Sequence, residues 1–217
     1  MAIAFFDLDQ TLLDGDSDFE WGAYLVSIGK VDVTTYETEN ERFYREYLAG
    51  NLDIQEYLRF ALRPLAENPY SKLCQWRETF IDTRIRPMIK TQAPDLIRQH
   101  RNAGHHPAII TSTNRFITEP IKDLLQVETL IATEPARIRG EFTGEIQGIP
   151  CFGKGKITHA RQWAESRSHS LEGSYFYSDS FTDLPLLETV DNPVAVDADE
   201  KLTEHAIRKG WKRLSLK

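Results

Sequence analysis

The sequence has only two cysteines, and it has no long apolar run. Cys74 and Cys151 are far apart and fit no metal-ligand spacing, which argues against a disulfide framework or a zinc site and favours a reducing compartment. The opening apolar run is interrupted at Asp7 and has no basic leader, so we expect neither a signal peptide nor a membrane span. Together these features predict a cytoplasmic protein.

The sequence also lacks an excess of positive charge. It has 26 Lys and Arg against 33 Asp and Glu, for a net charge of −7. Nucleic acids and anionic membranes select basic surfaces, so neither is expected as the main partner. A small anionic substrate would need a local positive site. The 217 residues, 41% of them hydrophobic, suffice for one large domain or for a core with a smaller insertion.

The first fourteen residues combine a short apolar run with two closely spaced carboxylates. Residues 2–6 are typical of a short buried strand in a parallel sheet. Asp7 and Asp9 follow at its expected end, and positions i and i+2 of a strand face the same side. Two like charges in one small volume need compensation by a cation or a shared proton. Mg²⁺ fits this need because it takes oxygen ligands and commonly bridges carboxylates to phosphate.

Residues 15–88 are predicted to form an all-helical insertion. Helical periodicity covers residues 16–30, 34–49, 53–65 and 70–88, and no strand pattern interrupts it. An insertion directly behind a catalytic-looking strand indicates a cap domain, joined to the core near Asp14 and Met88. We interpret its aromatic residues as packing residues of the cap: Trp21, Phe43, Tyr47, Phe60 and Trp76.

The rest of the chain alternates strands and helices, which predicts an α/β fold with a parallel sheet and crossover helices. Residues 1–14 and 89–217 would form this Rossmann-like core. Residues 136–149 are predicted to form a β-hairpin at the edge of the sheet. Strands are expected at residues 107–111, 128–132, 174–178, 193–196 and 212–216.

Polar residues occur at or just after several of these elements. Thr111 ends the second strand, Lys156 follows a glycine-rich run at residues 152–155, and Asp179 and Asp183 flank a turn after a later strand. Open parallel sheets bind ligands at the carboxyl ends of their strands. Carboxylates for a metal, together with a hydroxyl and an ammonium for an anion, suit phosphoryl transfer.

Four motifs in this order resemble those of the haloacid dehalogenase-like (HAD) superfamily, and specifically its phosphoserine phosphatase-like subfamily IB. They are DLDQT, IIT, GKGK and SDSFTD, at residues 7–11, 109–111, 153–156 and 178–183. The resemblance implies a Rossmann-like core, a C1-type helical cap and a Mg²⁺-dependent phosphatase that acts on a small phosphorylated metabolite through an aspartyl-phosphate.

The resemblance also implies two different roles for the first two carboxylates. Asp7 would be the nucleophile, whereas Asp9 would protonate the leaving alcohol and then activate water. Asp16, Ser17 and Thr113 are candidate contacts to the leaving group.

The phosphoryl oxygens would be held by Thr111, Ser112 and Lys156. Because Lys154 is only two residues from Lys156, it is the alternative cation at this position. The resemblance assigns the metal to four residues, of which Asp9 would use its backbone carbonyl and Asp183 would order the loop or a metal-bound water: Asp7, Asp9, Asp179 and Asp183.

The chain departs from phosphoserine phosphatases directly after Thr111. Ser112 and Thr113 stand where those enzymes have two glycines, which argues against phosphoserine as the substrate. Amino-acid phosphates, histidinol phosphate, sugar phosphates and lipid head-group phosphates stay open. The alternatives to hydrolysis are a phosphotransferase or mutase that uses the same intermediate, and a non-catalytic module that binds phosphometabolites.

Overall fold

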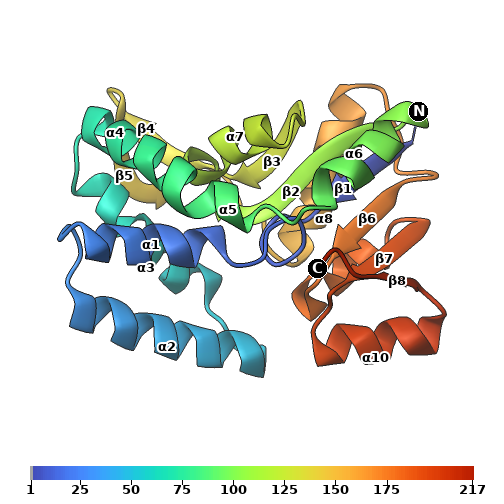
Figure 1. Ribbon diagram of the computed structural model, residues 1–217, viewed down its shortest axis with the longest axis horizontal. Coiled ribbons are helices and arrows are strands. Elements are labelled where there is room, and N and C mark those ends of the chain that lie inside the picture. The colour runs from blue at the N-terminus through green and yellow to red at the C-terminus, as the bar shows by residue number, and fades with distance from the viewer. Residues whose placement is uncertain (1) are drawn as a thin grey trace.

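The computed structural model describes residues 2–217 and has a parallel six-stranded sheet at its centre (Figure 1). The strand order is β3-β2-β1-β6-β7-β8, and every neighbouring pair in this sheet is parallel. The predicted α/β class is therefore confirmed. The strands are β1 (Ile3–Phe6), β2 (His106–Asn114), β3 (Thr129–Thr133), β6 (Tyr175–Ser178), β7 (Asn192–Val196) and β8 (Lys212–Leu214).

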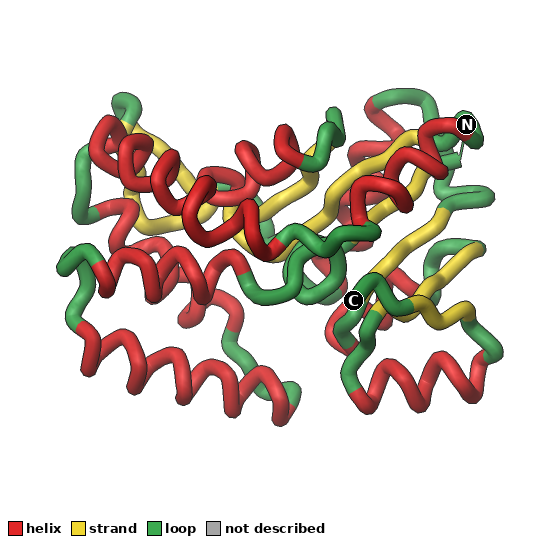
Figure 2. Tube along the Cα trace, in the orientation of Figure 1, coloured by secondary structure: helices red, strands yellow, loops and turns green. Residues whose placement is uncertain are grey.

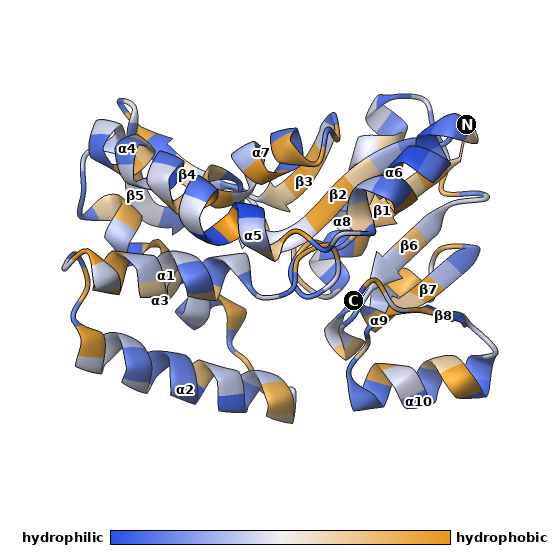
Figure 3. Cartoon of the chain, viewed as in Figure 1, coloured by the Kyte–Doolittle hydropathy of each residue, from blue (hydrophilic) through white to orange (hydrophobic). Residues whose placement is uncertain are grey.

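Helices cover both faces of the sheet and bury two apolar clusters. Successive side chains of a strand point to opposite faces, so Phe6 packs with Ile97 and Ile117 while Phe5 packs with Ala160 and Leu202. Strands β2 and β3 are among the most hydrophobic segments in Figure 3, as expected for strands that are buried on both faces of the sheet. The core helices are α6 (Ala93–Asn102), α7 (Arg115–Leu124), α8 (Lys154–Ser166), α9 (Leu184–Leu187) and α10 (Glu200–Lys209).

The segment between β1 and α6 is helical, as predicted (Figure 2). Its two connections to the core lie side by side, because Leu13 pairs with Ile89 and the Asp14 N–H donates to the Met88 carbonyl at 2.7 Å. This pairing supports the predicted domain limits near 14 and 88, which stay a prediction. The elements are α1 (Ser17–Ser27), α2 (Val33–Ala49), α3 (Ile54–Ala66), α4 (Tyr70–Phe80), a π-helical stretch (Ile81–Ile85) and α5 (Arg86–Met88).

The predicted hairpin forms, but its expected position at the edge of the main sheet is wrong. Strands β4 (Pro135–Ile138) and β5 (Glu141–Ile146) make a separate antiparallel pair. The buried Phe142 of β5 packs against Tyr70 and Phe116, with ring centroids 5.6 and 5.2 Å apart. The apolar side of the hairpin is therefore covered by helical residues instead of extending the sheet, and the hairpin links the core to the helical insertion.

Strand β2 continues three residues beyond its predicted end at Thr111. Its register against β3 shifts between Thr111 and Asn114, so the extra residues do not follow the regular ladder. The helix predicted near residues 183–189 is shorter, since a 3₁₀ turn (Phe181–Asp183) precedes α9. Within residues 2–217, no helix has the length and apolar character needed to cross a membrane.

Candidate active site

Asp7 and Asp9 lie on a tight turn directly after β1. The Asp7 N–H donates to the Tyr177 carbonyl at 2.9 Å, which extends the pairing with β6 by one residue. The turn then closes through a bond from the Gln10 N–H to the Gly15 carbonyl at 2.9 Å. Gln10 has a φ of +57°, a left-handed conformation that residues other than glycine adopt only occasionally. The turn therefore forms without a glycine at position 10.

Asp7 is paired with a buried ammonium group. The Lys156 Nζ lies 2.7 Å from Asp7 Oδ1 and 2.7 Å from Asp183 Oδ2, and the Lys156 side chain is only 3% exposed. Burial raises the pKa of Asp7 to about 7, although the charge of Lys156 acts in the opposite direction. Burial would lower the pKa of Lys156, but Asp183 and Asp7 outweigh it and raise that pKa. Lys156 therefore stays cationic.

The backbone at Gly155 passes close to the Pro150 carbonyl, and this contact positions Lys156 in the first turn of α8. A Cβ on Gly155 would lie 2.1 Å from the Pro150 carbonyl oxygen, so only glycine fits here. Lys154 is exposed, whereas Lys156 points into the site. The structure therefore brings Lys156, and not the alternative Lys154, to the carboxylates.

Asp9 has a different set of partners, all of them neutral donors. The Ser17 N–H donates to Oδ1 at 2.7 Å, and the Thr113 hydroxyl donates to Oδ2 at 2.7 Å. The Thr111 hydroxyl is farther from the same oxygen, at 3.5 Å. Burial is the largest cause that raises the pKa of Asp9 to about 6. The structure thus places Thr111 and Thr113 together beside Asp9, whereas Ser112 between them is half-buried.

Asp179 lies next to Asp7 and is held by Thr11, a contact to which sequence reasoning gave no role. The Thr11 hydroxyl donates to Asp179 Oδ1 at 2.9 Å, and it accepts from the Asp179 N–H at 3.1 Å. Burial, and then the charge of Asp7, raise the pKa of Asp179 well above its usual value. Thr11 belongs to the DLDQT motif, so the motif itself was the signal for its importance.

The residues around Asp7 fit a magnesium ion. The Asp179 carboxylate accepts from a hydroxyl and lies near the Asp7 charge, so a cation between the two would offset their repulsion. No three His, Cys, Asp or Glu side chains among residues 2–217 converge on one metal position. Mg²⁺ usually takes one or two carboxylates and completes its shell with water and phosphate oxygens. Asp7 and Asp179 therefore suffice as its carboxylate ligands.

Asp183 is arranged to hold Lys156. It is 2% exposed, and its Oδ2 accepts from both Lys156 Nζ at 2.7 Å and the Ser178 hydroxyl at 2.8 Å. These bonds leave this oxygen with no capacity to bind a metal directly. A role in ordering the loop, one of the two predicted for Asp183, agrees with this geometry.

Two of the three predicted leaving-group residues, Asp16 and Ser17, lie at the start of α1, whereas the third, Thr113, lies in β2 beside Asp9. Asp16 caps the helix by accepting from the Asp18 and Phe19 N–H groups, each at 2.9 Å, and Ser17 is fully buried. The Asp18 carboxylate, to which sequence reasoning gave no role in the site, accepts from the Tyr57 hydroxyl at 2.5 Å. Three carboxylates thus occur on this side of the site.

Tyr47 differs from its interpretation as a packing residue of the insertion. Its hydroxyl contacts the Ser180 hydroxyl in the loop after β6, next to Asp179. Lys201 makes a second link, because its Nζ donates to the Leu48 carbonyl at 2.8 Å. The end of α2 therefore touches the core beside the catalytic loop.

Known proteins resemble the chain over nearly its whole length. A model of the haloacid dehalogenase-like hydrolase family matches residues 4–188. A histidinol-phosphatase from Neisseria meningitidis is 41% identical over 219 residues, which cover 99% of each protein. A protein of unknown function from Bordetella pertussis has a solved structure with a TM-score of 0.93, 38% identity and coverage of 100% of this chain and 99% of that one.

A substrate-bound phosphoserine phosphatase shares the fold at lower sequence identity. Its TM-score is 0.73 at 19% identity, with coverage of 100% of this chain and 93% of that one. The family model spans most of the sheet and every predicted motif. The chain belongs to the haloacid dehalogenase-like hydrolase family.

Proposed function

We propose that the protein is a Mg²⁺-dependent phosphatase that hydrolyses a small phosphomonoester through an aspartyl-phosphate on Asp7. Membership of the family and the similarity to phosphatases confirm the predicted enzyme class. The observation that carries the mechanism is the contrast between two neighbouring carboxylates. Asp7 is paired with the Lys156 ammonium, whereas Asp9 accepts only from neutral donors.

In the first step, an Asp7 carboxylate oxygen forms a bond to phosphorus while the bond from phosphorus to the ester oxygen breaks. Asp9 donates its proton to that oxygen, so the leaving group departs as an alcohol. In the second step Asp9 takes a proton from water, the water oxygen attacks phosphorus, and the bond to Asp7 breaks. Inorganic phosphate leaves and both carboxylates return to their starting states. A pKa of Asp9 near 6 suits a group that must give and take a proton near neutral pH.

The residues around Asp7 hold the phosphoryl group and its charge. Lys156 supplies the local positive charge that an anionic substrate needs in a chain with a net charge of −7. The Thr111 hydroxyl and the backbone at the end of β2 contribute hydrogen bonds to the phosphoryl oxygens. Asp7, Asp179 and the Asp9 carbonyl would hold Mg²⁺, which when bound neutralises negative charge on the phosphoryl group and the nucleophile.

For the substrate, we propose the phosphate ester of an amino alcohol, with histidinol phosphate as the first candidate. The support is the relative named histidinol-phosphatase, which is 41% identical and covers 99% of this chain. Ser112 and Thr113, in place of the glycines of phosphoserine phosphatases, also favour a substrate other than phosphoserine.

The test is phosphate release from histidinol phosphate by the purified protein, with Mg²⁺ and with EDTA. We expect release that requires the metal and is lost in Asp7→Asn, because an amide cannot form the acyl-phosphate. Asp14→Asn is the matched control, since Asp14 is an exposed carboxylate seven residues away, and it should retain activity. Metal-independent release or an active Asp7→Asn variant would contradict the proposal. Phosphate that appears on an added alcohol instead of in solution would identify a phosphotransferase.

A further inference from the structure

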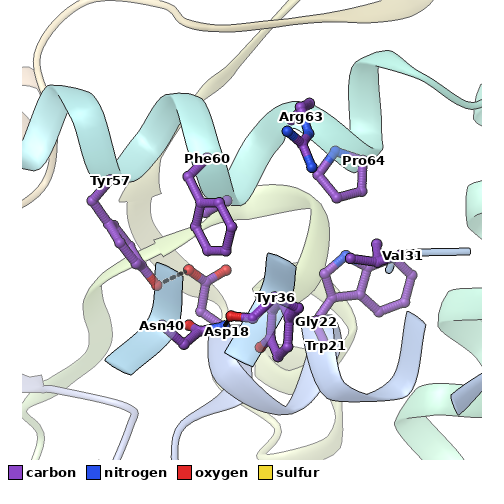
Figure 4. Close-up of a pocket in the computed structure, with 11 residues that line it drawn as sticks. Asp18, Trp21, Gly22, Val31, Tyr36, Asn40, Tyr57, Phe60, Arg63 and Pro64 are labelled. Carbon is purple, nitrogen blue, oxygen red and sulfur yellow. Dashed lines mark hydrogen bonds between the residues drawn. The ribbon is translucent and has the colours of Figure 1, made fainter. Parts of the chain in front are cut away.

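A small, mostly apolar pocket lies between α1, α2 and α3, and the Asp18 carboxylate forms part of its wall (Figure 4). Its other walls are mainly aromatic, and its volume of about 20 Å³ matches one water molecule or one ammonium group. The Tyr36 ring can lie against α1 only because residue 22 is glycine, where a Cβ would come within 2.2 Å of that ring. The residues used in the argument are Asp18, Trp21, Gly22, Tyr36, Tyr57 and Arg63.

Asp18 has no cationic partner among the described residues. It accepts from the Tyr57 hydroxyl at 2.5 Å and from the Asn114 amide at 3.5 Å, and both donors are neutral. Burial raises the pKa of Asp18 to about 6, and the charge of Asp9 acts in the same direction. Arg63 lies at the pocket, but its side chain is 52% exposed and its ion-pair partner is Glu67 at 3.6 Å. The pocket thus contains a carboxylate whose charge is not offset.

A second polar group in the same pocket also lacks a partner. Trp21 is 2% exposed, and no hydrogen-bond acceptor among residues 2–217 meets its Nε1–H. A buried N–H group without an acceptor is unfavourable unless a ligand or water completes it. The pocket therefore has room for a single small cationic group beside Asp18, and an acceptor for Trp21 would have to come from the adjoining part of the same molecule.

The pocket lies on the side of the active site from which the leaving group departs. The charge of Asp9, the proposed acid, contributes to the pKa of Asp18, and Asn114 connects Asp18 to the end of β2. We propose that Asp18 binds a cationic group of the leaving alcohol and so selects phosphate esters of amino alcohols. This inference rests on the proposed function, and it assigns the choice of substrate to a residue outside the family motifs.

The test compares histidinol phosphate with glycerol phosphate, whose leaving alcohol has no charge. In the wild-type protein we expect kcat/KM to be higher for histidinol phosphate than for glycerol phosphate. Asp18→Asn should lower the ratio of the two kcat/KM values by about 10- to 100-fold, mainly through KM, because a hydrogen bond to a charged group is lost. Glu20→Gln is the matched control, since it removes a carboxylate on the same helix whose nearest cation, Arg84, is 3.9 Å away. It should leave the ratio unchanged.

A measurement on the wild-type protein keeps the test independent of how the variant folds. Free histidinol should inhibit glycerol phosphate hydrolysis at least ten times more strongly than glycerol does. Equal inhibition by the two alcohols, or a ratio that is the same in Asp18→Asn and the wild type, would overturn the role of Asp18. Failure of the wild-type protein to hydrolyse either ester would instead refute the proposed function.

Discussion

Removal of the Lys156 ammonium gives the most direct test of the electrostatics in the site. Lys156→Met keeps an unbranched side chain that is only one atom shorter, but it leaves Asp7 and Asp183 facing each other with no cation from the protein. Both carboxylates lie 2.7 Å from Lys156 Nζ, and both are buried. A buried carboxylate that loses its partner is destabilising because neither water nor another charge replaces it.

We expect Lys156→Met to lower the free energy of unfolding at pH 7.5 by about 3–5 kcal/mol, the usual cost of breaking a buried pair. In a chain of this length, that corresponds to a fall in Tm of about 6–20 °C. The fall in the free energy of unfolding should be smaller at pH 5. The folded-state pKa of Asp7 is already about 7, against 3.8 in the unfolded chain, and without Lys156 it would be higher still. At pH 5 Asp7 is therefore protonated in the native state of both proteins, so removal of Lys156 no longer breaks an ion pair with it, whereas at pH 7.5 the wild type keeps that ion pair and the variant has lost it.

Urea unfolding followed by tryptophan fluorescence, in EDTA at pH 7.5 and pH 5, measures both effects. Lys154→Met is the matched control, because it removes an exposed ammonium two residues away, and it should change stability by less than about 0.5 kcal/mol. The reasoning fails if Lys156→Met costs less than about 1 kcal/mol. It also fails if the deficit is the same at both pH values.

Three further changes test other parts of the structure. Gly155→Ala should lower Tm and phosphatase activity together, because its Cβ would meet the Pro150 carbonyl oxygen at 2.1 Å; an unchanged Tm would exclude that contact. Burial lowers the pKa of His100 from 6.5 to about 4, so stability should fall by up to about 1.4 kcal/mol per pH unit as pH drops through that range, and His100→Gln should flatten this slope in urea unfolding. Asp9→Asn should lower kcat by about 10²- to 10⁴-fold for alkyl phosphates and much less for p-nitrophenyl phosphate, whose leaving group needs no proton; equal losses for the two esters would argue against Asp9 as the acid.

Sequence reasoning located the residues at the strand ends because parallel strands bring their carboxyl ends to one edge of the sheet. Asp7 follows β1, Asp179 follows β6, and both reach the same site although 172 positions separate them. The sequence also placed Lys156 directly after a glycine-rich run, and the structure shows a close backbone approach at Gly155 within that run. These predictions needed only local patterns and the geometry of a parallel sheet.

Contacts that depend on packing between elements could not be predicted in this way. The alternating pattern of residues 136–149 indicated a hairpin, but it contained no information about which surface would cover Phe142. Thr113 reaches Asp9 because the register of β2 shifts beyond Thr111, and no local pattern marks that shift. The Tyr47 contact to the core depends in the same way on how α2 lies over the loop after β6.

The residues around Asp7 and the residues around Asp9 differ in how far the family motifs predict them. On the Asp7 side, Lys156 and Asp179 occupy the positions that the family motifs predict, so chemistry at phosphorus follows from the resemblance. On the Asp9 side, the nearest hydroxyl belongs to Thr113 and a further, half-buried carboxylate to Asp18, neither of which is a family motif residue. In the proposed mechanism the leaving alcohol departs past Asp9, so substrate choice would depend on these residues. A change of specificity should therefore require substitutions on the Asp9 side alone, with the Lys156 side left intact.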